Sequence, residues 1–264
     1  MSDFRDVKGK VAIVTGAARG IGFGAAETFA SEGVHVVMSD VLPLVEESCE
    51  KLKKQYPDVQ LYSQMVDVSD ETAVKGLVDF TVDKFGKLDI LFSNAGIHIT
   101  PKNLWENDMA DVDKVLAVNF KGMFHCCKYA AQQMVKQKSG TIVNTGSFFG
   151  KVGHGGSAAY GASKAAVHTM TQALAMELAP YNVNVNALCP GLAASEMHWA
   201  FVEEDAKKRG ITFEEMKQIE LDEIPLSRYG YGSDMAGAIM WLASKSGEYV
   251  TGQLINVNGG LDFT

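Results

Sequence analysis

Runs of hydrophobic residues of strand length recur along the chain, and each is followed by a segment with helical spacing. Their Val, Ile and Leu content is nearly continuous, which is typical of strands that are covered on both faces of a parallel sheet. Strand alternating with helix predicts a doubly wound α/β fold, a Rossmann-type sheet of about seven parallel strands with right-handed crossovers. The expected strands are 11–15, 34–39, 59–66, 88–93, 141–146, 183–189 and 253–257.

Helices are expected between these strands, with no sign of a second domain. No internal repeat, low-complexity tract or Pro/Ser-rich linker divides the 264 residues, so we expect one domain over 1–264. The connection 192–226 is long, and it reads as two short helices, 196–208 and 213–223, around a glycine. Long insertions at a ligand-binding edge often form lids, so we expect a substrate lid there. The other expected helices are 21–31, 45–55, 71–85, 110–138, 157–179 and 234–244.

The helix expected over 157–179 has almost no continuous polar face, because alanines and larger apolar residues occur all round it. Such a helix is usually covered on more than one side, and the sheet can cover only one of them. A subunit interface explains this pattern, since exposed apolar surface of that extent is unusual on monomers. Packing of another helix of the same chain is the alternative.

Composition and charge exclude several classes of function. The formal charge is −8, and no basic tract interrupts the acidic balance, so we expect no nucleic-acid partner. No 18-residue apolar span predicts a membrane helix, and the polar N-terminus is unlike a signal peptide. Four cysteines without CxxC spacing indicate reduced thiols in a cytoplasmic protein, and we expect no zinc or catalytic metal.

A glycine-rich segment, TGAARGIG (15–22), follows the first expected strand directly and leads into a helix. Glycines allow backbone N–H groups to approach a pyrophosphate, and the helix N-terminus adds donors and a partial positive charge. The spacing is GxxxGxG rather than the GxGxxG of the usual dinucleotide fingerprint. The segment therefore predicts a phosphate-binding loop, and an ordinary glycine-rich turn is the alternative.

Asp40 ends the second expected strand, eighteen residues after Gly22. An acid at about this distance binds the adenosine ribose in dinucleotide-binding units, and its charge repels a 2′-phosphate. Asp40 therefore favours NAD over NADP, although a turn-forming aspartate is the structural alternative. Arg19, inside the glycine-rich segment, keeps NADP open as the less favoured cofactor.

Tyr160 and Lys164 lie one helical turn apart, so both side chains face the same small molecule. A neighbouring positive charge favours the phenolate, so we expect Lys164 to lower the pKa of Tyr160 and make it a proton carrier. Ser147, at the end of the preceding strand, is placed to hold a substrate oxygen near that phenol.

Taken in order, the glycine-rich segment, Asp40, Asn94-Ala95-Gly96 and Tyr160-x-x-x-Lys164 resemble the short-chain dehydrogenase/reductase family in its short, single-domain branch. The resemblance covers the chain from about residue 8 to residue 260. It implies that Asn119, Ser147, Tyr160 and Lys164 are catalytic. It also implies a coenzyme site at Gly16, Arg19, Gly20, Ile21, Gly22, Asp40, Asp67, Val68, Asn94, Ala95, Gly96, Tyr160, Lys164, Pro190, Gly191 and Ser195.

Two positions depart from the family pattern. Ser195 stands where Thr is frequent, and its hydroxyl preserves the contact with the nicotinamide carboxamide that the family implies. Gly146 precedes the catalytic serine where a second Ser is frequent, so an auxiliary contact is missing. Each assigned residue also has an ordinary structural alternative, such as a helix cap at Asp67 or a turn at Asn94.

The substrate is the least constrained prediction. Met197 and Trp199, with Phe201, are expected to close over it from the lid, and Phe149 and His154 to line the opposite loop. Several aromatic residues suit a cyclic or partly apolar alcohol, such as a hydroxysteroid or alicyclic ketone, whereas a histidine suits a sugar alcohol or hydroxy acid. Packing of these rings against the protein body is the alternative.

The sequence thus predicts an NAD(H)-dependent oxidoreductase that interconverts a secondary alcohol and its ketone, and the resemblance implies a homotetramer. An NADP-dependent ketone reductase is the nearest alternative. A non-catalytic nucleotide-sensing scaffold and a nucleotide-sugar epimerase or dehydratase are further alternatives. The intact proton-transfer residues argue against the scaffold, and the short C-terminal region argues against the epimerase.

Overall fold

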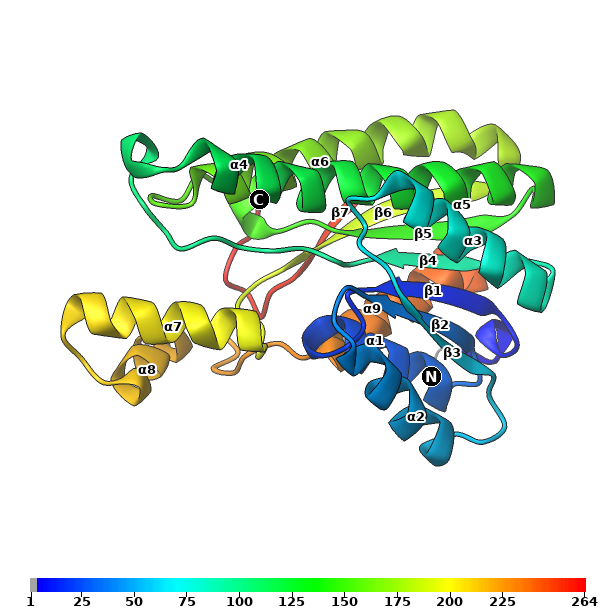
Figure 1. Cartoon of the computed structure of the whole chain (residues 1–264), viewed down its shortest axis with the longest axis horizontal. Helices are drawn as coiled ribbons and strands as arrows, with labels where there is room; N and C mark the ends of the chain where they lie inside the picture. Colours follow the sequence, from blue (N-terminus) through cyan, green and yellow to red (C-terminus); the bar gives the residue numbers. More distant parts are fainter. Residues whose placement is uncertain (1–3) are drawn as a thin grey trace.

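Seven parallel strands form one sheet in the computed structural model of the protein, which describes residues 4–264 (Figure 1). Their order across the sheet is β3-β2-β1-β4-β5-β6-β7, so the chain reverses its direction of travel between β1 and β4. This arrangement confirms the predicted doubly wound fold. The strands are β1 Val11–Thr15, β2 His35–Asp40, β3 Leu61–Met65, β4 Ile90–Ser93, β5 Gly140–Thr145, β6 Val183–Pro190 and β7 Leu254–Val257.

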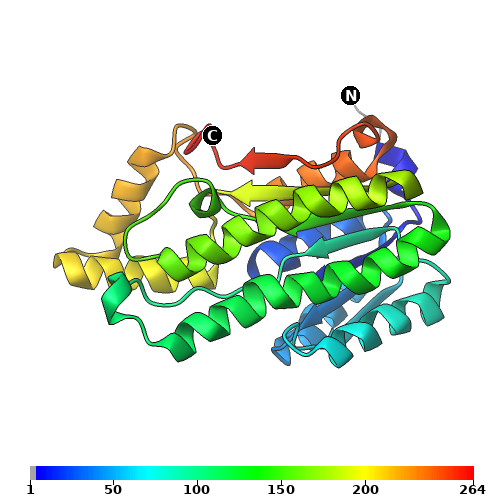
Figure 2. The same ribbon diagram turned by 90° about the horizontal axis from the view of Figure 1, so that it is seen from above.

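Helices cover both faces of the sheet. One face packs against α1, α2 and α9, and the other packs against α3, α5 and α6 (Figures 1 and 2). Burial on both faces explains why the strands read as continuous apolar runs. The helices are α1 Gly20–Ser31, α2 Leu44–Gln55, α3 Glu71–Phe85, α4 Met109–Leu116, α5 Met123–Gln137, α6 Ala158–Leu178, α7 Glu196–Arg209, α8 Phe213–Glu223 and α9 Gly232–Ala243.

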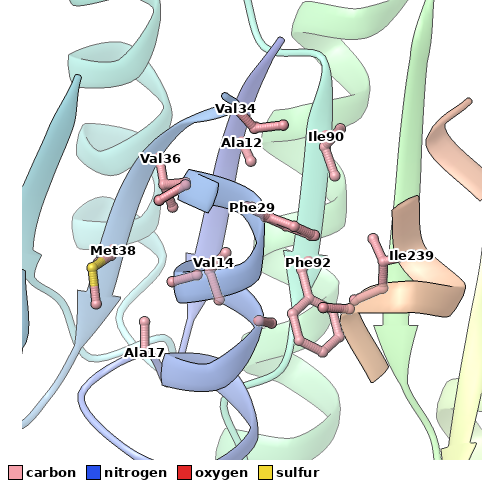
Figure 3. Packing of buried hydrophobic residues seen from close by; sticks show 14 of the residues in the cluster. Ala12, Val14, Ala17, Phe29, Val34, Val36, Met38, Ile90, Phe92 and Ile239 are labelled. Atoms are coloured by element: carbon pink, nitrogen blue, oxygen red, sulfur yellow. The ribbon is translucent and has the colours of Figure 1, made fainter. Parts of the chain in front are cut away.

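Buried side chains of the first face meet where the sheet reverses direction. Phe29 of α1, Phe92 of β4 and Ile239 of α9 pack together there and are fully buried (Figure 3). Strands β1 and β4 pair in parallel, with Ile13 opposite Leu91. The carboxyl ends of these two strands are thus held rigidly side by side, and a crevice at this point is where open α/β sheets bind ligands.

The segment 192–226 forms the two short helices that were expected, α7 and α8, which project from the sheet edge (Figure 1). Gly210 ends α7 in the left-handed conformation, with φ +69°. Thr212 and Glu215 form a capping box at the start of α8. The pair has its own small apolar cluster, formed by Val202, Ala206 and Met216 together with Trp199, Ile211 and Phe213.

The helix predicted over 110–138 forms with nearly those bounds, but it is not a regular α-helix throughout. A π-helical segment, Ala117–Gly122, separates α4 from α5. Two tight contacts accompany the wider turn: the Asn119 side chain bonds the backbone of Ile97, and Gly122 packs so closely on Val68 that a Cβ there would lie 2.6 Å from Val68 Cγ2. The apolar periodicity continues through this insertion, so the pattern alone does not reveal it.

The cysteines, the absence of a membrane-spanning helix among the described residues and the exposed face of α5 and α6 relate to the predictions from composition. All four cysteines are buried and unpaired. Within residues 4–264, no helix has both the length and the apolar content to cross a bilayer. Helices α5 and α6 lie side by side on one outer face (Figure 2), and Phe124 of α5 and Met176 of α6 are exposed.

We expect Phe92→Ala to lower the free energy of unfolding by about 3–5 kcal/mol, because it leaves a cavity under the point where the sheet reverses direction. Trp105→Ala is a matched control: its ring is 81% exposed, so the change should stay within about 0.5 kcal/mol. Urea unfolding of both variants measures the difference. An equal loss in the free energy of unfolding for the two variants would show that Phe92 does not support the core.

Candidate active site

The ends of β1 and β4 are tied together at the reversal point. The Thr15 hydroxyl accepts hydrogen bonds from the backbone N–H groups of Asn94, at 2.9 Å, and Ala95, at 3.0 Å. In return, the Asn94 amide donates to the carbonyl oxygens of Thr15, at 3.0 Å, and Gly16, at 3.3 Å. Asn94 therefore fixes the start of the glycine-rich loop. This structural role and the predicted coenzyme contact fall on the same residue.

The glycine-rich loop has the form that an anion-binding turn needs. Gly16 and Gly20 have φ values of +67° and +59°, which disfavour any residue with a Cβ. At Gly22 a Cβ would lie 2.1 Å from the Gly16 carbonyl oxygen. Helix α1 begins at Gly20 with no side chain capping its N-terminus and no acid in its first turn. The first N–H groups of the helix therefore fit a phosphate.

Asp40 lies at the end of β2, beside this loop. Its two carboxylate oxygens accept bonds from the N–H groups of Ala18 and Leu42, each at 3.0 Å. The turn-forming alternative is thus present in the structure. Because an ionised carboxylate offers about four acceptor positions, Asp40 keeps capacity for ribose hydroxyls. Arg19 lies 4.0 Å from Glu196, the first residue of α7, and both side chains are about half exposed.

Asp67 and Val68 follow β3 and differ in exposure. The Asp67 carboxylate is exposed and accepts bonds from the backbone and hydroxyl of Ser69. The residue that caps α3 is Asp70, which accepts from Thr72 and Ala73. Asp67 is therefore not a helix cap, and its carboxylate edge is open to a ligand.

Ser147, Tyr160 and Lys164 meet beside the end of β5. Ser147 follows β5, and its hydroxyl accepts from the Phe149 N–H at 3.2 Å. Burial raises the pKa of Tyr160 to about 12, and a hydrogen bond with Ser147 partly opposes this rise. The Lys164 ammonium lies 5.6 Å from the centre of the Tyr160 ring and donates to the Thr145 carbonyl at 2.7 Å.

The expectation that Lys164 lowers the pKa of Tyr160 is wrong in this structure. Desolvation of the buried phenol dominates its pKa. Burial also disfavours the ammonium and lowers the pKa of Lys164 to about 8. The site therefore holds a protonated phenol next to an amine that gains and loses its proton close to neutral pH.

Asn119 lies fully buried in the π-helical segment. Its amide oxygen accepts from the Ile97 N–H at 2.8 Å, and its nitrogen donates to the Ile97 carbonyl at 2.9 Å. The same nitrogen donates to the Ser163 hydroxyl at 3.1 Å. Asn119 therefore ties the segment that follows β4 to α6. Its oxygen and the Lys164 ammonium both border Gly96, within 3.3 and 3.6 Å of where a Cβ would lie.

The segment after β6 carries the remaining predicted coenzyme residues. Pro190 ends β6, and Gly191 packs so closely on Asn258 that a Cβ would lie 2.9 Å from that side chain. The Ser195 hydroxyl caps α7 by accepting from the His198 N–H at 3.2 Å. The Ser195 hydroxyl is therefore already engaged in a helix cap, and the predicted nicotinamide contact would use the same hydroxyl.

Aromatic rings surround the phenol. His98 meets Tyr160 edge-on, with ring centres 4.5 Å apart, and Phe201 of α7 lies 5.8 Å from His98. Phe149 lies 5.9 Å from Tyr160 and stacks on the exposed His154 at 3.9 Å. Burial lowers the pKa of His98, so its ring is neutral at neutral pH.

The predicted substrate residues of α7 lie in different surroundings. Trp199 packs against Tyr229 and Phe213, the contact that the packing alternative describes, and Met197 is exposed. Phe201, two residues after Trp199, contacts His98 at the site. Residues 199 and 201 point in different directions because successive helical positions are about 100° apart. The sequence signal for His98 was its position just after Asn94-Ala95-Gly96.

The sheet is doubly wound and has a glycine-rich, phosphate-binding type of loop at its reversal point. A phenol, a hydroxyl and an amine lie together at the same edge of the sheet. These features are typical of nucleotide-dependent enzymes of the α/β class. A family model described as enoyl-(acyl carrier protein) reductase matches residues 16–262. The chain belongs to the short-chain dehydrogenase/reductase family, as the resemblance in its sequence predicted.

Several proteins of known sequence or structure are similar over nearly the whole chain. The 3-oxoacyl-[acyl-carrier-protein] reductase FabG of Staphylococcus aureus strain Mu50 is 38% identical over 255 residues, which cover 96% of this chain and 98% of the relative. The crystal structure of NAD+-bound xylitol dehydrogenase has a TM-score of 0.90 at 34% identity, covering 96% and 99% of the two chains. The structure of levodione reductase has a TM-score of 0.91 at 29% identity, covering 96% and 97%.

We expect Lys164→Met to stabilise the protein at neutral pH while removing activity. Because the pKa of Lys164 is lowered in the folded state, the unfolded chain binds more protons between about pH 8 and 10.5, and stability rises with pH there. The gain from the substitution should be roughly 1–3 kcal/mol below pH 8, at 1.36 kcal/mol per pKa unit, and should shrink toward pH 10.5.

Urea unfolding at pH 7.5 and pH 10 measures this gain. The exposed Lys128, paired with Glu71 on the surface, supplies the control Lys128→Met, which should not raise stability at either pH. A loss of stability in Lys164→Met at pH 7.5 would show that the bond to Thr145 outweighs the desolvation of the ammonium.

Proposed function

We propose that the protein is an NAD(H)-dependent oxidoreductase that interconverts a secondary alcohol and its ketone, with Tyr160 as the acid and base. The observation that carries the proposal is the grouping of Tyr160, Ser147 and Lys164 beside the end of β5, with the Lys164 ammonium 5.6 Å from the centre of the Tyr160 ring. It lies at the same edge of the sheet as the glycine-rich loop. A non-catalytic nucleotide sensor needs the loop but has no use for this proton-transfer group.

The residues around the crevice fit a nicotinamide dinucleotide. The uncapped start of α1 suits the pyrophosphate, and Asp40 suits the hydroxyls of the adenosine ribose. Asp67 and Val68 border the place of the adenine, and Asn94, Gly191 and Ser195 the nicotinamide side. When bound, the nicotinamide donates or accepts the hydride.

In this proposal, Tyr160 handles the proton of the substrate oxygen. In the reducing direction the phenol protonates the forming alkoxide, and Ser147 donates a hydrogen bond to the same oxygen. In the oxidising direction Tyr160 first gives its own proton to the neutral amine of Lys164, and the resulting phenolate then takes the hydroxyl proton. Lys164, whose pKa is about 8, then exchanges protons with the phenol and passes them toward Asn119 and solvent. Because its pKa is raised, the phenol is protonated at neutral pH, which is the state that the reducing direction requires.

The proposed substrate is a partly apolar alcohol or ketone with a second polar group. His98, Phe149 and Phe201 border the phenol with ring faces and edges, which suits a ring or a short apolar chain. The neutral imidazole of His98 adds one polar contact near the reacting carbon. The similarity to xylitol dehydrogenase and to levodione reductase supports testing a panel of candidate substrates that contains both polyols and ketones.

Reduction of a 3-oxoacyl thioester is a second candidate, favoured by the 38% identity to a 3-oxoacyl-[acyl-carrier-protein] reductase. A short-chain 3-oxoacyl coenzyme A ester, assayed with NADH and NADPH, tests it beside the alcohols and ketones. Turnover of the thioester far above the other substrates would select this candidate. The proton chemistry at Tyr160 is the same in both cases.

We also propose that the chain forms a homo-oligomer, as a tetramer, through the α5–α6 face. Phe124 and Met176 expose apolar surface there, and Met176 is 74% exposed. Covering this face also accounts for the nearly polar-free pattern of α6.

Tyr160→Phe tests the proposed function directly. We expect kcat to fall by about 10²–10⁴-fold, the usual contribution of a general acid, with little change in NADH affinity. Initial rates and NADH fluorescence titration measure the two effects. Tyr181→Phe, at the far end of α6, is the control and should retain wild-type rates. Normal turnover by Tyr160→Phe would refute the assignment.

Asp40→Asn tests the choice of coenzyme. Removing the charge weakens the interaction with the ribose hydroxyls and removes repulsion of a 2′-phosphate, so we expect the NAD/NADP ratio of kcat/KM to fall by about tenfold or more. The amide oxygen retains one acceptor for the loop. Arg19→Ala is the companion variant: if NADP is the natural coenzyme, this change lowers the NADP rate, and Asp40→Asn leaves the ratio unchanged.

A further inference from the structure

A third polar residue follows Tyr160 and Lys164 at the same spacing on α6. His168 lies one turn beyond Lys164 and two turns beyond Tyr160, so the three side chains share one face of the helix. His168 is buried, with 6% of its side chain exposed. Its ring lies against the backbone of Ser147.

The ring of His168 contacts both ends of the turn that carries Ser147. Its Nε2 atom accepts from the Ser147 N–H at 3.4 Å. The Cys189 thiol of β6 lies 3.4 Å from the same atom. On its other side the ring packs against Gly150, the last residue of the short 3₁₀ turn Phe148–Gly150.

Two glycines make room for this ring. A Cβ at Gly146 would lie 2.5 Å from Nε2 of His168, and a Cβ at Gly150 would lie 2.7 Å from its Cε1. Carbon and nitrogen atoms that are not bonded do not approach so closely, so neither position accepts a side chain while His168 is present. Gly146, which departs from the frequent Ser in the family pattern, is thus explained by its neighbour on α6.

The ring is neutral at physiological pH. Burial lowers the pKa of His168 to about 4, and the charges of Lys151 and Lys164 contribute to the lowering. Cys189, the remaining titratable group that faces the ring, carries a buried thiol whose own pKa is raised. Because a neutral imidazole has one N–H donor and one acceptor nitrogen, the Ser147 N–H requires Nε2 to be the acceptor and Nδ1 to carry the proton.

We propose that His168 is a positioning residue, which fixes Ser147 relative to Tyr160 and Lys164 from the same helix, and that Gly146 is the matching residue that admits its ring. This proposal rests on the proposed catalytic role of Ser147. A single helix then sets the spacing of the phenol, the amine and the serine hydroxyl. A shift of the serine turn by about 1 Å is enough to slow such a reaction about 100-fold.

A double-mutant cycle tests whether His168 acts through Ser147. We expect His168→Ala to lower kcat by about 10- to 100-fold with NADH affinity unchanged, using the fastest substrate of the panel. In a Ser147→Ala background the same change should cost less than about 3-fold, because the residue it positions is gone. Met170→Ala, another buried side chain of α6, should have the same small effect in both backgrounds. An equal loss from His168→Ala in both backgrounds would overturn the proposal.

A further variant separates positioning from packing. His168→Gln keeps an uncharged acceptor, so it should recover much of the kcat that His168→Ala loses. It should also remove a pH effect: because the folded pKa is lowered from 6.5 to about 4, wild-type stability falls on acidification through that range, whereas the Gln variant lacks this contribution. An activity for His168→Gln as low as that for His168→Ala would indicate a packing role only.

Thermal unfolding of Gly146→Ala gives a readout that does not require turnover. We expect this variant to lose several degrees of thermal stability, and Gly146→Ala/His168→Ala to regain part of that loss, since the ring no longer meets the new methyl group. If no substrate of the panel reacts, the proposed function fails while this coupling still stands. Additive losses in the double variant would overturn the pairing of Gly146 with His168.

Discussion

The buried ammonium of Lys164 is the constraint on which the rest of the site depends. Its hydrogen bond to the Thr145 carbonyl holds α6 against the end of β5 and offsets only part of the cost of burying a charge. Tyr160 lies one turn before it and His168 one turn after it, so both are fixed when Lys164 docks. The lowered pKa of Lys164 reflects this cost, and the same shift suits the amine to the proton transfer proposed for it. In that proposal, stability is given up at the residue that the chemistry uses.

Much of the fold follows from local signals in the sequence. The strands were predicted because both faces of the sheet are covered, which leaves continuous apolar runs. Helices α7 and α8 were predicted to within a residue from two helical patterns around a glycine, and in the structure Ser195, Gly210 and Thr212 cap their ends. The glycine-rich loop was recognisable because its backbone conformation and close contacts restrict those positions to glycine.

The features that the sequence did not predict depend on contacts between distant segments. The π-helical turn at Asn119 follows from the tie to Ile97 and the packing of Gly122 on Val68, while the apolar pattern runs through it unchanged. The pKa of Tyr160 was predicted to fall because the charge of Lys164 is visible in the sequence, whereas the burial that raises it is not. Trp199 and Phe201 were indistinguishable as lid aromatics until the rotation of α7 was known.

Several residues have structural bonds in addition to the functional roles proposed for them, although sequence reasoning treats the two as alternatives. Asp40 holds the glycine-rich loop through two N–H groups and still has lone pairs for a ribose, because a carboxylate accepts more bonds than the turn requires. Asn119 ties Ile97 to α6 and thereby keeps its oxygen and Lys164 at the border of Gly96. A residue that is already held by structural bonds needs little reorganisation when a ligand binds. The caps, ties and turns around the crevice are therefore the means by which the site is preorganised.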